Sequence, residues 1–343
     1  MRVKNSAKKR MAIVATSAKM VRFFLVNHIV ELSKEYDITV ICNLSKQEDC
    51  LDILPGSVEV HNLPLERNIN ILSDIRSLFL LTVFFYKKDF SITYSISPKG
   101  GFLCAISAWF TTVPIRVHTF TGQVWVVKKG LKRYFLKYLD RITSTISTII
   151  IVDSLSQKDF LEGQNVVKKN KALVIGYGSI SGVDVKRFHP DKNARDKVRL
   201  DMNVQNSAIV FLFVGRLKKD KGVFEYIEAA KILKQKLPNV EFELYGDIDI
   251  HNPASLTSND IENIKKDGFI KVYGFSSNIA KVFQESNIVV LPSYREGLPK
   301  VLIEAAACGR AVVTTNVPGC RDAIEPNITG LLCKVKDSKS LAN

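Results

Sequence analysis

The sequence predicts an α/β protein made of two doubly wound domains in tandem. Two series of short, apolar, β-rich runs alternate with segments of helix length, which is the pattern of parallel α/β sheets. The polar stretch FHPDKNARDK separates the two series, and 343 residues exceed a typical single core. We therefore assign residues 1–187 to an N-terminal domain, 188–197 to a linker and 198–343 to a C-terminal domain, with a cleft between the domains.

The predicted strands follow each other at regular intervals in both domains. In the N-terminal domain they lie at 11–16, 37–42, 91–96, 115–120 and 148–153. In the C-terminal domain they lie at 208–215, 240–246, 270–275, 288–292 and 311–315. Open parallel sheets bind ligands outside the carboxyl ends of their strands, so we look for functional residues in the loops after these strands.

The positive charge of the chain is concentrated in its first half. The formal net charge is +15. Residues 1–195 hold 29 Lys and Arg against 16 Asp and Glu, whereas residues 196–343 hold 20 against 18. Such an imbalance suits nucleic acid, an anionic membrane surface or a phosphorylated substrate. Nucleic acid is the weakest of the three, because no nucleic-acid-binding motif accompanies the charge.

The cysteines and the apolar runs indicate a cytosolic protein without a membrane-spanning segment. The six cysteines are scattered and form no CxxC pair, which is typical of reduced, mostly buried thiols. The start of the chain imitates a signal peptide, but Lys19 interrupts its apolar part after about seven residues. The longest apolar run, LFLLTVFFY at 78–86, has about half the length that a membrane span needs.

A stretch with two glutamates, EGLPKVLIEAAACG, runs from Glu296 to Gly309 and follows a predicted strand. Pro299 suits the first turn of a helix, and Gly309 suits its C-terminal stop. The free N–H groups of such a helix start favour an anion such as a diphosphate, and Lys300 adds a full positive charge. Glu304, about one turn further along, could accept hydrogen bonds from two neighbouring hydroxyls.

A second loop after a predicted strand, VGRLKKDKG, supplies further cations. It places Gly215 after a β-run, and its Arg216 and Lys221 suit phosphate oxygens as a bidentate fork and a point charge. Taken alone, this loop and the two glutamates more often belong to a solvated surface. Together in one domain they indicate a nucleotide-diphosphate site, with Glu304 on the ribose and Glu296 at the other end of the ligand.

These motifs resemble those of the retaining glycosyltransferases of family 4, which have the GT-B fold of two tandem Rossmann-like domains with an interdomain cleft. The matching pieces of the second domain are GRLKKDKG, ELYGD with HNPASL, VYGF, LPSYREGLPKVLIEAAACGRAVVTTNVPGCRDAI and NITGLL. In the first domain RVHTFTGQVW, VDSLSQKDFL and GSISGVDVKRFHP look like the branch that extends lipid-linked bacterial surface saccharides. The resemblance covers nearly the whole chain.

The resemblance implies a role for each matching residue. Arg216 and Lys221 would neutralise the donor diphosphate as it departs, and Gly215 in the same loop would also contact the donor. Glu304 would hold the ribose. Glu296 would hold the transferred sugar, and His118, at the end of the strand IRVHTF, would lie near that sugar. The sugar would also contact the backbone of Gly297, Leu298, Pro299 and Lys300.

The resemblance also implies how the reaction proceeds. The anomeric configuration of the sugar would be retained, with the leaving phosphate assisting the acceptor, so we assign no dedicated general base. Asp247 and Asp249 in GDID look like a metal-binding pair of a different glycosyltransferase fold. In this family an acidic turn occupies that position, and GT-B enzymes need no obligate metal, so no metal and no cofactor is expected.

The segment VVKKGLKRYFLKYLDR, at 126–141, is a candidate membrane-surface helix. Leu131, Phe135 and Tyr138 share one helical face, and the basic residues lie largely elsewhere. The pattern fits a helix lying on an anionic membrane surface, and it equally fits a helix whose apolar face packs in the core. The resemblance implies an undecaprenyl-diphosphate-linked acceptor, which favours a cytoplasmic protein attached peripherally to the inner face of the plasma membrane.

Two departures from the family pattern leave other functions open. The turn ATSAKMVRFF at 15–24 lacks a glycine-rich loop, and the chain stops at Asn343 where family members continue, so the C-terminal domain is expected to be truncated. The leading hypothesis is transfer of a hexose or N-acetylhexosamine from a nucleotide sugar, expected to be a UDP-sugar, in O-antigen, capsule or exopolysaccharide synthesis. The alternatives are a catalytically inactive nucleotide-sugar-binding remnant and a GT-B nucleotide-sugar epimerase, although such epimerases lack the EGLPKVLIEA arrangement.

Overall fold

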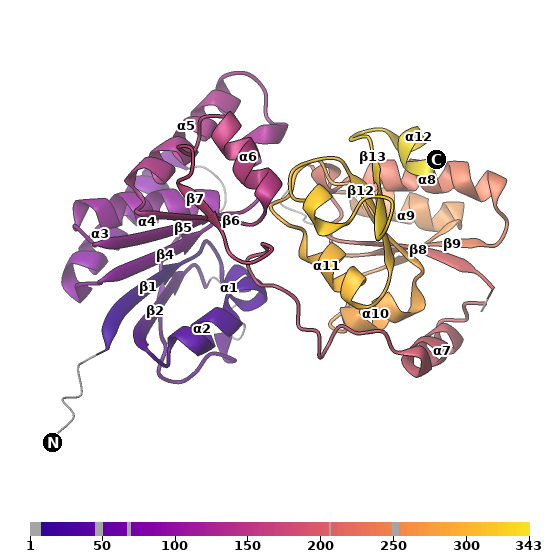
Figure 1. Ribbon diagram of the computed structural model, residues 1–343, viewed down its shortest axis with the longest axis horizontal. Coiled ribbons are helices and arrows are strands. Elements are labelled where there is room, and N and C mark those ends of the chain that lie inside the picture. Colours follow the sequence, from indigo (N-terminus) through magenta and orange to yellow (C-terminus); the bar gives the residue numbers. More distant parts are fainter. Residues whose placement is uncertain (1–7, 45–50, 67–69, 206, 249–253) are drawn as a thin grey trace. The chain divides into compact units, whose positions relative to one another are not determined.

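The computed structural model of the protein describes residues 8–44, 51–66, 70–205, 207–248 and 254–343 (Figure 1). The chain forms two compact units, Met1–Ser181 and Gly182–Asn343. Each unit is a parallel β-sheet with helices in its crossovers, so the predicted α/β class with two doubly wound sheets is confirmed.

The described part of the N-terminal unit holds a seven-stranded parallel sheet in the order β3-β2-β1-β4-β5-β6-β7. Its strands are β1 (Lys9–Val14), β2 (Tyr36–Cys42), β3 (Glu59–Asn62), β4 (Ile92–Ile96), β5 (Ile115–Phe120), β6 (Ile149–Val152) and β7 (Ala172–Val174). All the strands predicted for this half are present. The sequence did not predict β3 or β7, because EVHN and ALV are too short and too mixed to form an apolar run.

Helices cover both faces of the N-terminal sheet, with α1 and α2 below it and α3, α4 and α5 above it in Figure 1. They are α1 (Ala18–Phe24), α2 (Val26–Leu32), α3 (Ile71–Lys88), α4 (Pro98–Phe110), α5 (Gly130–Ile146) and α6 (Leu155–Gly163). Both faces of β1 are buried, since Met11 and Ile13 enter one core while Ala12 and Val14 enter the other. This explains why its sequence is an unbroken apolar run. Within the described ranges, no helix is long and apolar enough to cross a membrane.

The described part of the C-terminal unit holds a six-stranded parallel sheet in the order β10-β9-β8-β11-β12-β13. Its strands are β8 (Ile209–Val214), β9 (Val240–Tyr245), β10 (Ile270–Tyr273), β11 (Ile288–Leu291), β12 (Ala311–Thr315) and β13 (Gly330–Cys333). Its helices are α7 (Lys192–Asp201), α8 (Val223–Lys236), α9 (Ser258–Asp267), α10 (Ile279–Glu285), α11 (Lys300–Ala307) and α12 (Ser338–Ala342). The sequence predicted five of these strands and missed β13.

The structure differs from the predicted domain boundary. The stretch predicted as a linker, 188–197, begins with Phe188 in the C-terminal core and continues into α7, which starts after the Asp191 cap. The buried Arg199 guanidinium donates to the Glu285 carbonyl at 2.8 Å, and Arg195 donates to the Gln284 carbonyl at 2.6 Å. These arginines fix a polar segment onto α10, so the segment belongs to the C-terminal unit rather than to a linker.

Candidate functional site

Two loops at the carboxyl ends of neighbouring strands build the candidate site in the C-terminal unit. The loop after β8 carries Gly215, Arg216 and Lys221, and the loop after β11 carries Glu296 and leads into α11. Strands β8 and β11 pair with each other in the sheet. The predicted donor residues of both loops therefore come from adjacent strand ends, as the topology of a parallel sheet requires.

Helix α11 begins where the sequence predicts. Pro299 is its N-cap residue, Lys300 is its first helical residue, and Gly309 adopts a left-handed conformation just after its end, with φ +71. Glu304 lies one turn into the helix and is 9% exposed. Burial raises the pKa of the Glu304 carboxyl, while Lys300, whose Nζ lies 3.5 Å from Glu304 Oε1, opposes that rise.

Glycines allow the backbones of these loops to touch. Gly222 closes the loop after β8 with φ +75, and a side chain there would overlap the Pro292 carbonyl in the loop after β11. Gly319, in the loop after β12, has φ +79 and would overlap the Gly297 carbonyl if it carried a Cβ. The loop that carries Glu296 is thus held between two glycine contacts.

The candidate catalytic residues of the two loops meet as an ion pair. Lys221 Nζ donates a hydrogen bond to Glu296 Oε1. The two side chains are only 20% and 12% exposed, so solvent screens their interaction less than it screens a surface pair. The structure thus brings together the lysine expected on the diphosphate and the glutamate expected on the sugar.

Sequence reasoning missed Asp220, which joins the two loops. Its backbone carbonyl accepts hydrogen bonds from the Tyr294 N–H at 2.9 Å and from Ser293 Oγ at 3.0 Å. Its carboxylate accepts from Arg295 Nη2 at 2.8 Å. The one signal in the sequence is an acidic residue inside the basic run KKDK, and the residues that it contacts in the other loop are more than 70 positions away along the chain.

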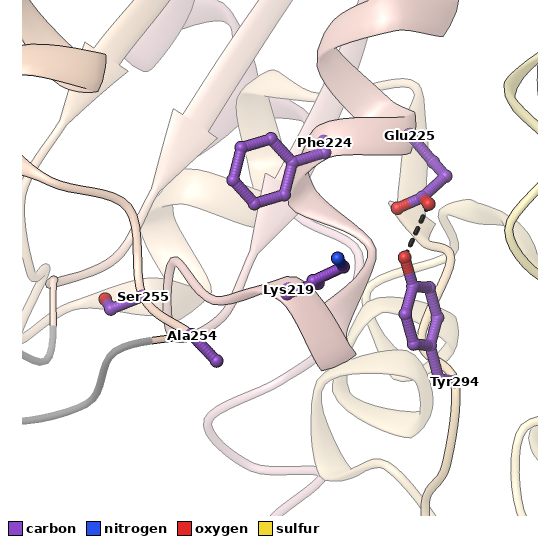
Figure 2. A pocket seen from close by; sticks show the side chains of 6 residues that line it. All are labelled: Lys219, Phe224, Glu225, Ala254, Ser255 and Tyr294. Carbon is purple, nitrogen blue, oxygen red and sulfur yellow. Dashed lines mark hydrogen bonds between the residues drawn. The ribbon is translucent and has the colours of Figure 1, made fainter. Parts of the chain in front are cut away.

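A cavity of about 310 Å³ lies beside the loop after β8, at the start of α8 (Figure 2). Its lining residues are Lys219, Phe224, Glu225, Ala254, Ser255 and Tyr294. None of the predicted donor residues lines it, so this cavity is not the predicted donor site. Figure 2 shows the Tyr294 hydroxyl pointing to the Glu225 carboxylate, to which it donates a hydrogen bond of 2.5 Å. This bond is a third tie between side chains of the loop after β11 and of the region after β8, beside Lys221–Glu296 and Arg295–Asp220.

His118 lies inside the N-terminal unit, on β5. It is 1% exposed, and its Nδ1 lies 3.0 Å from Ser95 Oγ. Its ring lies against Gly101, where any Cβ would overlap the ring. Burial lowers the pKa of His118 to about 3, so the imidazole is neutral at physiological pH. Its predicted place near the transferred sugar stays a prediction.

Asp247, one of the two acidic residues of GDID, accepts a hydrogen bond from the Phe275 N–H at 3.1 Å. It therefore holds the backbone that follows β10. Asp249 lies outside the described residues. Among the residues that are described, no group of three or more His, Cys, Asp or Glu side chains is placed to hold a metal ion.

The apolar face of the predicted basic helix is exposed on the N-terminal unit. The segment forms a short 3-10 helix, Val124–Val127, followed by α5, in which Leu131 is 88% exposed. Phe135 and Tyr138 are also exposed, so this face does not pack in the core. The inner side of α5 is fixed by Asp140, which is buried and accepts a 2.8 Å hydrogen bond from Trp125 Nε1.

The two sheets have the GT-B fold, which solved structures of glycosyltransferases share. Anabaena HepE in complex with UDP-glucose superposes with a TM-score of 0.74 at 18% identity, over 97% of this chain and 87% of that one. The model of the family described as glycosyl transferases group 1 matches residues 195–343.

Full-length relatives extend this match to both units. The Staphylococcus aureus capsular polysaccharide biosynthesis glycosyltransferase CapM is 32% identical over 282 residues, which cover 82% of this chain and 73% of CapM. An Escherichia coli UDP-Gal:α-D-GlcNAc-diphosphoundecaprenol α-1,3-galactosyltransferase is 28% identical over 316 residues, covering 91% of this chain and 79% of that protein. The chain belongs to the glycosyl transferases group 1 family and is a glycosyltransferase.

Proposed function

We propose that the protein transfers a hexose or N-acetylhexosamine from a UDP-sugar to an undecaprenyl-diphosphate-linked saccharide, with retention of configuration, in the synthesis of a bacterial surface polysaccharide. The observation that carries this proposal is the meeting of Lys221 and Glu296 beside the start of α11. The names of the S. aureus and E. coli relatives support the polysaccharide and the lipid-linked acceptor, and the E. coli name supports UDP. Retention, as in family 4, follows from the motif resemblance.

In the proposed donor complex each end of the ligand has its own charged group. Arg216 and Lys221 hold the diphosphate, and they stabilise the charge that develops on it as the glycosidic bond breaks. Glu304 accepts hydrogen bonds from the ribose hydroxyls. Its carboxylate suits this role because it is largely shielded from solvent. Glu296 and the backbone of 297–300 hold the transferred sugar, and we keep the proposal that His118 contacts it.

The chemistry proposed for this site uses no metal and no organic cofactor. Two cationic side chains and the N-terminal end of α11 supply the positive charge that a departing diphosphate needs. The leaving phosphate oxygen takes the proton of the acceptor hydroxyl on the same face of the sugar, so no side chain is required as a general base. Lys300 places one more cation at the same helix end.

The lipid-linked acceptor is proposed to be reached from the inner surface of the plasma membrane. Helix α5 exposes Leu131, Tyr134, Phe135 and Tyr138 between lysines and arginines, as a helix in an anionic membrane surface does. Helices α3 and α5 each pack on α4, and α3 exposes a second apolar stripe. That stripe consists of Ile71, Leu72, Ile75 and Phe79. The excess of basic residues in 1–195 adds attraction to anionic lipids.

The proposed reaction is tested with purified protein, a panel of UDP-sugars and synthetic undecaprenyl-diphosphate-linked mono- and disaccharides. The expected result is one donor and one acceptor that give a product with the anomeric configuration of the donor, assigned by nuclear magnetic resonance. Product of inverted configuration would contradict retention. UDP binding without turnover on any acceptor would favour an inactive binding protein, and release of a free epimer would favour an epimerase.

A further inference from the structure

We infer that Asp220 is a positioning residue that sets the loop after β8 against the loop after β11, and so holds Lys221 and Glu296 in the geometry that the donor needs. The inference rests on the proposed donor site. Asp220 would not touch the donor in this account. It would act through its two neighbours in sequence and space, Lys221 on its own loop and Arg295 on the other.

The carboxylate of Asp220 binds one cation from each loop. Lys218 Nζ lies 2.8 Å from Asp220 Oδ1, within the loop after β8. Arg295 Nη2, from the loop after β11, lies 2.8 Å from Asp220 Oδ2. The side chains of Lys218, Asp220 and Arg295 are 6%, 15% and 19% exposed, so this is a partly buried network rather than a pair of surface contacts.

The backbone of Asp220 repeats the same connection. Its carbonyl accepts from the Tyr294 N–H and from Ser293 Oγ, and Ser293 is fully buried. Three hydrogen bonds from three consecutive residues of one loop therefore end on one residue of the other. Asp220 precedes Lys221, and Arg295 precedes Glu296, so a shift between the loops would separate the ion pair directly.

The charge state of Asp220 fits this role. Burial alone would raise the pKa of its carboxyl, but Arg295 and Lys218 together hold that pKa below its usual range, so the group is ionised at neutral pH. Asp220 in turn supports the charge of Lys218, whose pKa burial and Arg216 lower to about 8. The carboxylate thus compensates the positive charges of Lys218 and Arg295, which it contacts directly.

A purely electrostatic view and the positioning view predict opposite effects of neutralising Asp220. If Asp220 contributed only its negative charge, Asp220→Asn would strengthen binding of the anion UDP, since a like charge near the ligand would be gone. If Asp220 positions the loops, the same substitution weakens UDP binding, because Asn holds Arg295 through a neutral and weaker hydrogen bond. The sign of the change separates the two views.

The test compares three variants of the full chain by titration calorimetry with UDP and by hydrogen exchange without ligand. Asp220→Asn removes the charge at nearly constant shape. Arg295→Gln removes the ion pair of Asp220 across the loops and leaves the Lys218 contact in place. Glu228→Gln is the matched control, because Glu228 forms an exposed pair with Lys231 on α8, with 3.1 Å between Nζ and Oε1. Melting temperatures show whether each variant is folded.

The expected result is a loss of UDP affinity of roughly tenfold or more in both Asp220→Asn and Arg295→Gln, with faster exchange of the amides of 293–298 and no change in Glu228→Gln. Unchanged or tighter UDP binding by Asp220→Asn, with unchanged exchange of the amides of 293–298, would overturn the inference. If the unaltered protein does not bind UDP, the proposed donor site fails, while the amide exchange of 293–298 in the same variants still decides whether Asp220 holds the two loops together.

Discussion

Lys221 and Glu296, 75 positions apart in sequence, are joined by a hydrogen-bonded ion pair at the carboxyl edge of the C-terminal sheet. In the proposed reaction these residues serve different parts of the donor, the diphosphate and the sugar. Without a ligand each neutralises the other. Donor binding therefore exchanges one protein–protein ion pair for contacts between Lys221 and phosphate and between Glu296 and sugar hydroxyls.

The Glu296→Gln variant separates these two roles. Glutamine no longer competes with phosphate for Lys221, so UDP is expected to bind at least as tightly as to the unaltered protein. Transfer should fall by about a hundredfold or more, because the sugar loses a charged hydrogen-bond acceptor. Calorimetry with UDP and initial rates of transfer measure the two effects. A parallel loss of UDP affinity and of transfer would show that Glu296 acts on the diphosphate end as well.

Glu304 is expected to act on the ribose alone. Glu304→Ala should weaken UDP binding by roughly ten- to a hundredfold, because the ribose hydroxyls lose the buried carboxylate that accepts their hydrogen bonds. The variant should weaken binding of 2′,3′-dideoxy-UDP very little, since that ligand has no hydroxyls to donate. Competition titrations of both nucleotides against the unaltered protein and the variant measure these affinities. An equal loss for both ligands would place Glu304 elsewhere than on the ribose.

Membrane attachment through α5 predicts a specific effect of two exposed side chains. The double variant Leu131→Ser, Phe135→Ser should lose most of its binding to phosphatidylglycerol vesicles in a sedimentation assay, because these apolar groups would enter the lipid interface. Leu200→Ser, at an exposed leucine on α7, is the matched control. Sedimentation of the double variant at the level of the unaltered protein would rule out this face of α5 as the anchor.

Glu285 predicts a dependence of stability on pH. Burial, then the neighbouring Glu243, raises the pKa of Glu285 from 4.5 to about 9. Between these values the folded chain keeps a proton that the unfolded chain has released, so the contribution is complete below about pH 4.5 and is lost as the pH rises toward 9. Glu285→Gln should therefore raise the melting temperature more at pH 8.5 than at pH 5.5.

Calorimetric melts at the two pH values test this effect, with Glu262→Gln on the exposed side of α9 as the control. Tyr245 donates to Glu285 Oε1 at 3.3 Å, and the glutamine oxygen can keep that bond. An equal change in melting temperature at both pH values would mean that Glu285 is already ionised in the folded protein.

Local signals in the sequence predicted what short segments determine by themselves. Pro299 and Gly309 mark the two ends of α11, because the backbone conformations needed there favour these residue types. The apolar, β-rich runs that alternate with segments of helix length predicted the central strands of both sheets, because strands buried on both faces need such runs. The residues of the two donor loops could be chosen because both loops follow such strands.

The remaining features depend on contacts between distant segments. Asp220 gains its role only when its loop meets Ser293 and Arg295, and nothing within KKDK specifies that meeting. The polar sequence of 188–197 predicts a linker, but its second half forms the start of α7, which the buried contact of Arg199 with α10 holds in place. The exposure of Leu131 on α5 likewise follows from which side of the helix faces the sheet, and both sides were possible from sequence.

The most direct test of the account is a calorimetric titration of UDP into the unaltered protein and into Lys221→Ala. The account predicts binding to the unaltered protein and a loss of affinity of about ten- to a hundredfold in the variant, with the fold retained, because a charged hydrogen bond to the diphosphate is removed. Equal affinity of the two proteins for UDP would contradict the assignment of Lys221, and with it the donor site built on the Lys221–Glu296 pair.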